Sequence, residues 1–158
     1  MKQLIIIAIL VMLGMTSTAQ AKRATGGIED VMTVDTILNN FMLHWIGKPY
    51  KLGGSTEKGI DCSQFTKRLY KDVYVKELAN VAYKQWEQTE RVKKDSLQIG
   101  DLIFFRSRVS PSGWHCGAYI GNTMFIHAAN RYEGVKVSSL NEPRYKVSIR
   151  GYGRLKQY

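Results

Sequence analysis

The chain has 158 residues and a formal net charge of +10, and 44% of its residues are hydrophobic and 11% aromatic. This length fits one domain better than two, and the composition is that of a packed globular protein, which excludes disorder or a fibrous repeat for most of the chain. The basic excess favours anionic surroundings, but the charges are scattered and no nucleic-acid-binding motif accompanies them, so we expect no nucleic-acid partner.

The first segment, residues 1–21, has the pattern of a secretory signal peptide. Lys2 precedes an apolar run from Leu4 to Leu13, and the segment ends in Ala19-Gln20-Ala21, which suits a signal peptidase. The run has about 10 residues, about half of what a bilayer span needs, so we expect no stable membrane insertion. No cysteine lies near the cleavage point. We therefore expect an exported protein, periplasmic or extracellular, that is not lipid-anchored.

Helices are predicted in the first part of the remaining chain. Residues 22–34 are polar and are expected to form a flexible lead-in to a single domain over 35–158. A first helix begins near Asp35, its expected N-cap, and ends before Gly47 and Pro49. His44 lies within it without a nearby ligand partner in the sequence, and we expect it to be a surface or structural histidine.

A second helix is predicted to begin at Cys62, with Asp61 as its cap. Apolar residues recur at helical intervals from this cysteine, which places it in the first turn; they are Cys62, Phe65, Leu69 and Val73. Residues 77–90 could form another short helix.

After Gly100 the pattern changes to short strands. Leu102–Phe105 is an apolar run typical of a buried strand, and residues 116–120 and 124–128 flank a turn as a β-hairpin. Residues 135–137 and 146–149 are weaker strand candidates. Helices followed by antiparallel strands predict an α+β fold in which N-terminal helices pack on a central antiparallel sheet.

The position of Cys62 suggests a nucleophile. The first turn of a helix offers unpaired backbone N–H groups and the positive end of the helix dipole, which favour a thiolate. A cysteine peptidase also needs an imidazole and a group that orients it. His115 and His127 lie on the two strands of the predicted hairpin, where one could receive a hydrogen bond from the other.

Two alternatives remain for these residues. The two cysteines of an exported protein could form a disulfide, but strand alternation sends Cys116 to the face opposite His115, which would turn it away from Cys62. Two cysteines and two histidines could also bind zinc, but the paired ligand spacing of structural zinc sites is missing. We therefore expect no metal.

Five linked motifs carry a family resemblance, and their order and spacing hold over residues 35–155. They are Pro49-Tyr50-x-x-Gly53-Gly54, Asp61-Cys62-Ser63, Gly100-Asp101-Leu102-Ile103-Phe104-Phe105, His115-x-Gly117 with Tyr119-Ile120-Gly121-Asn122, and Phe125-Ile126-His127-Ala128. The chain resembles the NlpC family of bacterial cell-wall cysteine peptidases. The resemblance implies a papain-like fold, with Cys62 as the nucleophile, His115 as the general base and acid, and His127 as the residue that orients His115.

The resemblance also implies that Tyr50, Asp61 and Ser63 line the substrate cleft. In that family the tyrosine hydroxyl is thought to help polarise the scissile carbonyl. Trp114 is either a cleft wall or an ordinary packing residue. Gln64 replaces the usual glycine and could narrow the cleft or shift the helix start, and Cys116 replaces a small aliphatic residue and is expected to be a buried small hydrophobe.

Together with the predicted signal peptide, the resemblance leads us to expect an exported cysteine endopeptidase, a monomer without a cofactor, whose partners are peptidoglycan peptides. It would hydrolyse amide bonds in stem peptides or cross-links through a thioester acyl-enzyme. The alternatives are an acyltransferase or amidase with the same fold that acts on another substrate, and a non-catalytic wall-binding module.

Overall fold

The computed structural model describes residues 33–156, so the predicted signal peptide and nearly all of the predicted lead-in lie outside the described part. The helices are α1 (Val34–Trp45), α2 (Cys62–Tyr74), α3 (Ala82–Glu87) and α4 (Pro143–Lys146), with a single 3-10 turn at Lys94–Ser96. The strands are β1 (Ser55–Thr56), β2 (Gly59–Ile60), β3 (Thr89–Val92), β4 (Leu102–Arg106), β5 (Trp114–Gly121), β6 (Met124–Ala128), β7 (Val135–Ser139) and β8 (Ile149–Leu155).

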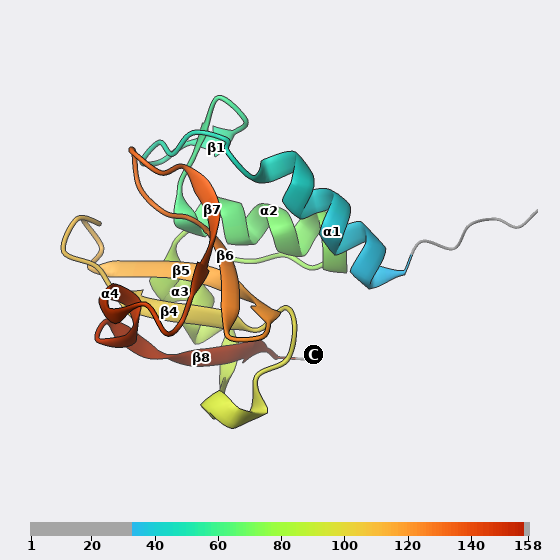
Figure 1. Cartoon of the computed structure of the whole chain (residues 1–158), viewed down its shortest axis with the longest axis vertical. Helices are drawn as coiled ribbons and strands as arrows, with labels where there is room; N and C mark the ends of the chain where they lie inside the picture. Colours follow the sequence, from blue (N-terminus) through green and yellow to red (C-terminus); the bar gives the residue numbers. More distant parts are fainter. Residues whose placement is uncertain (1–32, 157–158) are drawn as a thin grey trace, which may run out of the picture. The chain divides into compact units, whose positions relative to one another are not determined.

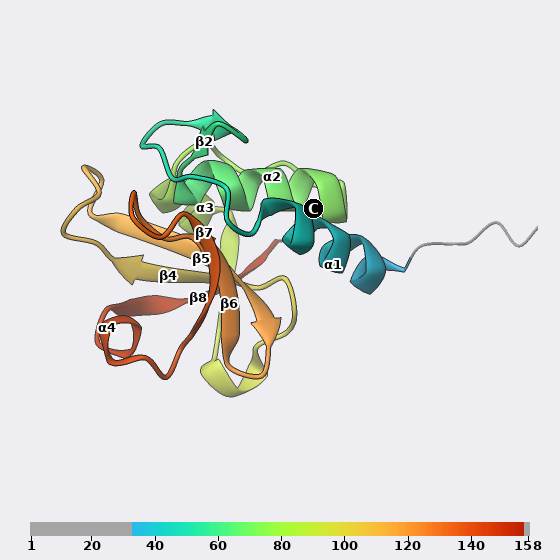
Figure 2. The same cartoon turned by 45° about the horizontal axis from the view of Figure 1, so that its top comes forward.

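A six-stranded antiparallel sheet forms the centre, in the order β3-β8-β4-β5-β6-β7. Helices α1 and α2 lie on one face of it and α4 lies toward the other (Figures 1 and 2). The larger core fills the space between α1, α2 and the sheet, and a smaller core joins the opposite face to Tyr145 of α4. The predicted α+β fold, with helices on an antiparallel sheet, is confirmed.

The predicted helix boundaries hold with one correction. The N-cap of α1 is Thr33, whose side chain accepts a hydrogen bond from the Thr36 amide, and Asp35 lies in the first turn. Gly47, with φ +84°, follows the helix end as expected. His44 is exposed and lies 2.9 Å from Glu57, so it is a surface residue.

The short helix expected within residues 77–90 is present as α3, and it is followed by β3, which pairs with β8 more than fifty residues later in the chain and which the sequence did not indicate. The predicted strand at 146–149 is wrong. Pro143 occupies the first turn of α4, where its missing N–H is not needed, and β8 begins only at Ile149.

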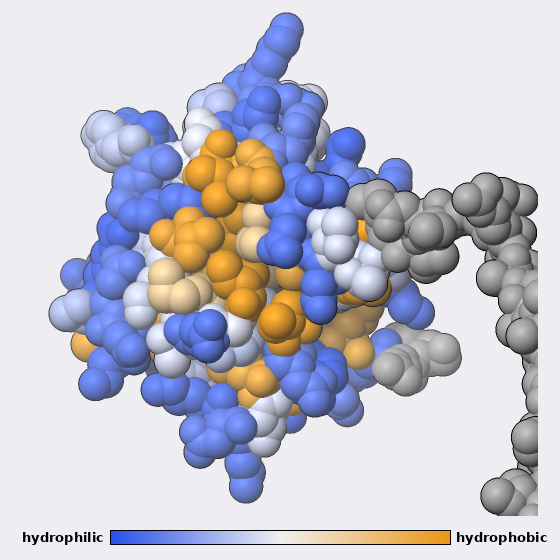
Figure 3. Space-filling view, turned by 45° about the vertical axis from the view of Figure 1, so that its right-hand side comes forward, coloured by the Kyte–Doolittle hydropathy of each residue, from blue (hydrophilic) through white to orange (hydrophobic). Residues whose placement is uncertain are grey.

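Apolar side chains also reach the surface. Figure 3 shows one face on which they gather between hydrophilic residues. The exposed large apolar residues of the described surface include Val34, Leu43, Ile46, Val75 and Ile99. No helix within residues 33–156 is long and apolar enough to cross a membrane.

Candidate active site

The N-terminus of α2 holds Cys62 through contacts close to it in the sequence. The Asp61 carboxylate caps the helix by accepting a hydrogen bond from the backbone N–H of Gln64 at 2.8 Å, and it also accepts one at 3.0 Å from the backbone N–H of Gly53 in the preceding loop. Cys62 follows directly and is only 6% exposed. Its sulfur therefore lies in the first helical turn, where the helix dipole favours a negative charge.

The second cysteine lies under the first. Cys116 is fully buried, and its sulfur is 3.5 Å from Oγ1 of Thr66, one turn after Cys62 on α2. Both cysteines are free thiols. The expectation that strand alternation turns Cys116 away from Cys62 is wrong, because α2 packs on the face of β5 that carries Cys116.

The two thiols differ in their tendency to ionise. Hydrogen bonding from Cys116, and then the charge and hydrogen bonding of His115, hold the pKa of Cys62 well below its usual value despite burial. Burial, followed by the neighbouring Cys62, raises the pKa of Cys116 well above its usual value. Cys62 is therefore the thiol that becomes a thiolate, and Cys116 remains a protonated hydrogen-bond donor.

His115 and His127 meet directly. Nε2 of His115 lies 2.7 Å from Nδ1 of His127, and the two rings are close to perpendicular at 79°. The recorded pairing of β5 and β6 ends at Ala118 opposite Ile126, so the histidines are diagonal neighbours and not direct cross-strand partners. β5 carries His115 and β6 carries His127, so this contact joins two neighbouring strands of the sheet.

Gly117 makes this diagonal contact possible. A Cβ at this position would lie 2.8 Å from the Phe125 ring and 3.0 Å from the Cβ of His127. These separations are shorter than van der Waals contact allows, so a side chain at position 117 would displace Phe125 and His127.

The second ring nitrogen of His127 contacts two hydroxyl groups. Nε2 lies 3.1 Å from Oγ of Ser138 and 3.2 Å from Oη of Tyr145. Burial, and then the charge of His115, lower the pKa of His127 well below 6.5, so its ring stays neutral. A neutral ring that carries its proton on Nε2 donates to these hydroxyls and accepts the Nε2 proton of His115 at Nδ1.

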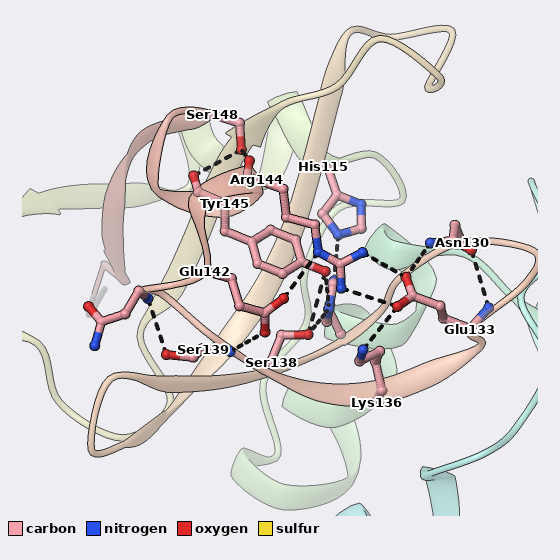
Figure 4. Close-up of polar contacts among 12 residues, drawn as sticks. His115, Asn130, Glu133, Lys136, Ser138, Ser139, Glu142, Arg144, Tyr145 and Ser148 are labelled. Carbon is pink, nitrogen blue, oxygen red and sulfur yellow. Dashed lines mark hydrogen bonds and ion pairs between the residues drawn. The ribbon is translucent and has the colours of Figure 1, made fainter.

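An ion-pair cluster anchors the helix that carries Tyr145. The guanidinium of Arg144 makes two 3.1 Å contacts with the carboxylate of Glu133, and Lys136 adds a third at 3.0 Å (Figure 4). Hydrogen bonds from Arg144 and Lys136 lower the pKa of Glu133 to about 2. Sequence reasoning missed Ser138, Tyr145 and this cluster, and the one available signal was Pro143, which marks a helix start.

A narrow cavity of about 240 Å³ lies over Cys62. Tyr50, Asp61, Cys62, Ser63 and Trp114 all line it, so the structure brings together the predicted nucleophile and the predicted substrate-binding residues. Burial, and then the charges of Cys62 and Asp61, raise the pKa of Tyr50 to about 12, which keeps its hydroxyl protonated as a donor.

The structure gives different answers to the questions that the sequence left open about Trp114 and Gln64. Trp114 lines the narrow cavity and also packs on other rings, with its ring centroid 6.2 Å from that of Phe104. It is therefore both a cavity wall and a packing residue. Gln64 neither shifts the start of α2 nor lines this cavity, because its side-chain amide turns to donate to the carbonyl of Asn80 at 3.0 Å.

A wider cavity of about 1230 Å³ adjoins the histidine side. It is lined by His115 and His127, and by four arginines, which are Arg106, Arg108, Arg131 and Arg144. Within the described residues no three His, Cys, Asp or Glu side chains gather in a way that could hold a metal ion. Residues 33–156 therefore offer no ligand cluster for the zinc site considered as an alternative.

The sequence matches the NlpC/P60 family over residues 47–154, and the chain belongs to this family. It is 45% identical over 102 residues to the Escherichia coli K12 protein named Murein DD-endopeptidase MepS/Murein LD-carboxypeptidase, a match that covers 65% of this chain and 53% of that one. It is 36% identical to the protein named Probable endopeptidase NlpC from the same organism, over 87% of this chain and 88% of that one.

A solved NlpC/P60 family structure from Bacillus cereus is similar with a TM-score of 0.69 and 30% identity, over 78% of this chain and 41% of that one. The chain thus spans about half the length of the MepS relative and less than half of this solved chain.

Proposed function

We propose that this NlpC/P60 protein is an exported cysteine endopeptidase that hydrolyses amide bonds in peptidoglycan stem peptides or cross-links through a thioester acyl-enzyme. The observation that carries the proposal is that His115, whose charge and hydrogen bonding lower the pKa of Cys62, lies 2.7 Å from His127. The names of the two Escherichia coli relatives, which describe endopeptidases, support it.

The first half of the proposed reaction is acylation. The Cys62 thiolate attacks the scissile carbonyl, while the backbone N–H of Cys62 and the Tyr50 hydroxyl are the candidate donors to the oxyanion. His115 then gives its proton to the leaving amine, the C–N bond breaks, and the acyl group remains on sulfur as a thioester.

The second half is hydrolysis. His115, now neutral, takes a proton from a water molecule that attacks the thioester carbonyl, and the thiolate of Cys62 leaves. His127 holds the His115 ring in the orientation and tautomer that both steps need. The low pKa of His127 fits this role, because a neutral His127 ring can accept a hydrogen bond from the N–H of His115.

The basic composition of the chain, with a formal charge of +10, would keep such an enzyme near an anionic cell envelope. The predicted signal peptide is the basis for proposing export, and the apolar run is too short for a stable membrane anchor.

Digestion of purified, muramidase-solubilised peptidoglycan tests the proposal. The protein and its Cys62→Ser variant are incubated with the same material under reducing conditions, and the products are identified by mass spectrometry. We expect cleaved stem peptides, or monomers from cross-linked dimers, with the unaltered protein only, and the fragment masses name the bond. If neither protein cleaves several types of wall, the hydrolase proposal fails in favour of acyl transfer or binding, and equal cleavage by both would remove Cys62 from the mechanism.

A further inference from the structure

A cluster of buried polar side chains joins α2, α3 and β5 beneath the reactive cysteine. Its members are Thr66 on α2, Gln85 on α3 and Cys116 on β5, and each of them is fully buried. None of the three lines the narrow or the wide cavity. Any influence that they have on the reaction must therefore pass through a neighbouring group.

The Gln85 amide needs one hydrogen-bond donor from this cluster. Its Nε2 donates both protons to backbone carbonyls, to that of Ser63 at 2.8 Å and to that of Ala79 at 2.9 Å. Its Oε1 is left as a buried acceptor, and a buried amide oxygen without a donor is costly. Two donors reach it within the described residues, the Thr66 hydroxyl at 2.8 Å and the Cys116 thiol at 3.5 Å.

The single hydroxyl proton of Thr66 has one favoured acceptor. Besides Gln85, the hydroxyl oxygen lies 3.0 Å from the carbonyl of Ser63 and 3.2 Å from that of Cys62. Both carbonyls lie in α2 and accept a backbone N–H one turn later, and that of Ser63 also accepts from Gln85. The shortest contact leads to the acceptor with the greatest need, so Thr66 donates to Gln85.

This assignment decides where the thiol proton of Cys116 can go. An S–H group is a weak donor, and the nearer hydroxyl already serves the Gln85 oxygen. The Cys116 proton is then available to the sulfur of Cys62. The neighbouring Cys116 thiol is also the largest cause of the low pKa of Cys62.

Other titratable groups surround the same sulfur. They are His115 on β5, Asp61 at the start of α2 and Tyr50 in the loop that precedes β1. The contacts of the Thr66 hydroxyl in the described part of the chain include none of these three groups. An effect of this hydroxyl on the thiolate is therefore separable from theirs.

We propose that Thr66 is a positioning residue for the nucleophile: by giving its proton to Gln85, it leaves the Cys116 thiol to donate to the Cys62 sulfur. Without the hydroxyl, the Gln85 oxygen takes the Cys116 proton, and Cys62 loses a donor that stabilises its thiolate. The proposal rests on the proposed function, in which Cys62 is the nucleophile, and deepens it by naming a residue that prepares this thiolate without touching the substrate.

Alkylation of Cys62 by iodoacetamide, measured against pH with peptide mapping, tests the proposal. Thr66→Val keeps the shape of the side chain and removes the hydroxyl. We expect the midpoint of the profile to move up by about one pH unit, so that alkylation well below the midpoint slows about tenfold. Thr66→Ser restores the hydroxyl and should return the profile toward that of the unaltered protein.

The matched control is Thr89→Val. Thr89 is a buried threonine whose hydroxyl donates to the carbonyl of Trp86 at 2.9 Å, and it lines neither cavity. Its profile should not move. Alkylation needs no peptidoglycan, so this test gives a result whether or not the protein hydrolyses the wall, and digestion by the unaltered protein is scored separately.

Two further variants separate the proposed route from a general disturbance of α2. In Cys116→Ala the thiol proton is absent, so adding Thr66→Val should cause no further shift of the profile. Gln85→Met removes the competing acceptor without altering Thr66, so its profile should not move to higher pH. Urea denaturation of each variant shows whether its fold is retained.

Four results would overturn the proposal. The first is an unchanged profile in Thr66→Val, and the second is a profile of Thr66→Ser equal to that of the valine variant. The third is a shift of the same size when Thr66→Val is made in the Cys116→Ala protein, which would show that the route does not pass through the second thiol. The fourth is a shift to higher pH in Gln85→Met, which would mean that any change beneath α2 disturbs Cys62.

Discussion

The two sides of the reaction centre are held in place differently. Cys62 is placed by contacts within a short stretch of chain, from the amide of Gly53 to that of Gln64, both of which meet the Asp61 carboxylate. The histidine pair depends instead on β5, β6, β7 and α4, because His127 is fixed by Ser138 and by Tyr145, which is 18 residues away.

This difference separates two properties of the site. The helix start determines where the sulfur lies, whereas the packing of the sheet on α4 determines how the imidazoles point. Changes on the cysteine side should therefore act on thiol reactivity and helix stability, and changes on the histidine side should act on proton transfer.

The largest expected effect comes from His115, which joins the two sides. His115→Ala removes both the proton donor for the leaving amine and a group that stabilises the Cys62 thiolate, so kcat for a stem-peptide fragment should fall about a thousandfold. His44→Ala is the control, because His44 is exposed and lines neither cavity, and the activity of this variant should be unchanged. Activity in His115→Ala close to that of the unaltered protein would contradict the proposed role.

On the cysteine side, Asp61→Ala removes the cap of α2 and leaves two backbone N–H groups without their partner. The free energy of unfolding, measured by urea denaturation, should fall by about 1–2 kcal/mol. Asp61→Asn retains an acceptor and should lose less. If the two variants were equally stable, the cap would not be what holds this helix start.

On the histidine side, Tyr145→Phe removes one hydroxyl that His127 contacts and keeps the ring that packs on Phe105 and Phe125. We expect kcat to fall about fivefold, the effect of one hydrogen bond, while KM and the unfolding midpoint change little. Tyr83→Phe on α3 is the matched control. A change in KM with constant kcat would indicate a role in substrate binding instead.

The smallest effect concerns Cys116. Cys116→Ala removes the neighbouring thiol that is the largest cause of the low pKa of Cys62, so this pKa should rise and the pH profile of Cys62 alkylation by iodoacetamide should move to higher pH. Above both pKa values the two rates should converge, because the thiolate is then complete in each protein. Cys116→Ser restores a donor and should return the profile toward lower pH; an unchanged profile in the alanine variant would exclude this contact as a cause.

The same contrast explains what the sequence could predict. The start of α2 at Cys62 and its cap follow from neighbouring residues, and the apolar run of Leu102–Phe105 marks a buried strand by itself. Strand β3 could not be predicted from residues 77–90, because its hydrogen bonds come from β8. Tyr145 was missed for the same reason, since its role depends on a contact with His127 that no local pattern encodes.

The error over Cys116 is of another kind. Strand alternation correctly places His115 and Cys116 on different faces of β5, but it does not say on which face α2 packs. Once α2 covers the Cys116 face, both residues can approach the same sulfur from different directions.

The account depends most on Cys62 being the nucleophile, and stoichiometric alkylation tests this directly. The protein is treated with increasing amounts of iodoacetamide below the pH at which Cys116 ionises, the modified cysteine is identified by peptide mapping, and hydrolysis of solubilised peptidoglycan is measured in the same samples. We predict that activity falls in proportion to modification of Cys62 and reaches zero at one alkyl group per chain, with Cys116 unmodified. Full modification of Cys62 with retained hydrolysis would contradict the account.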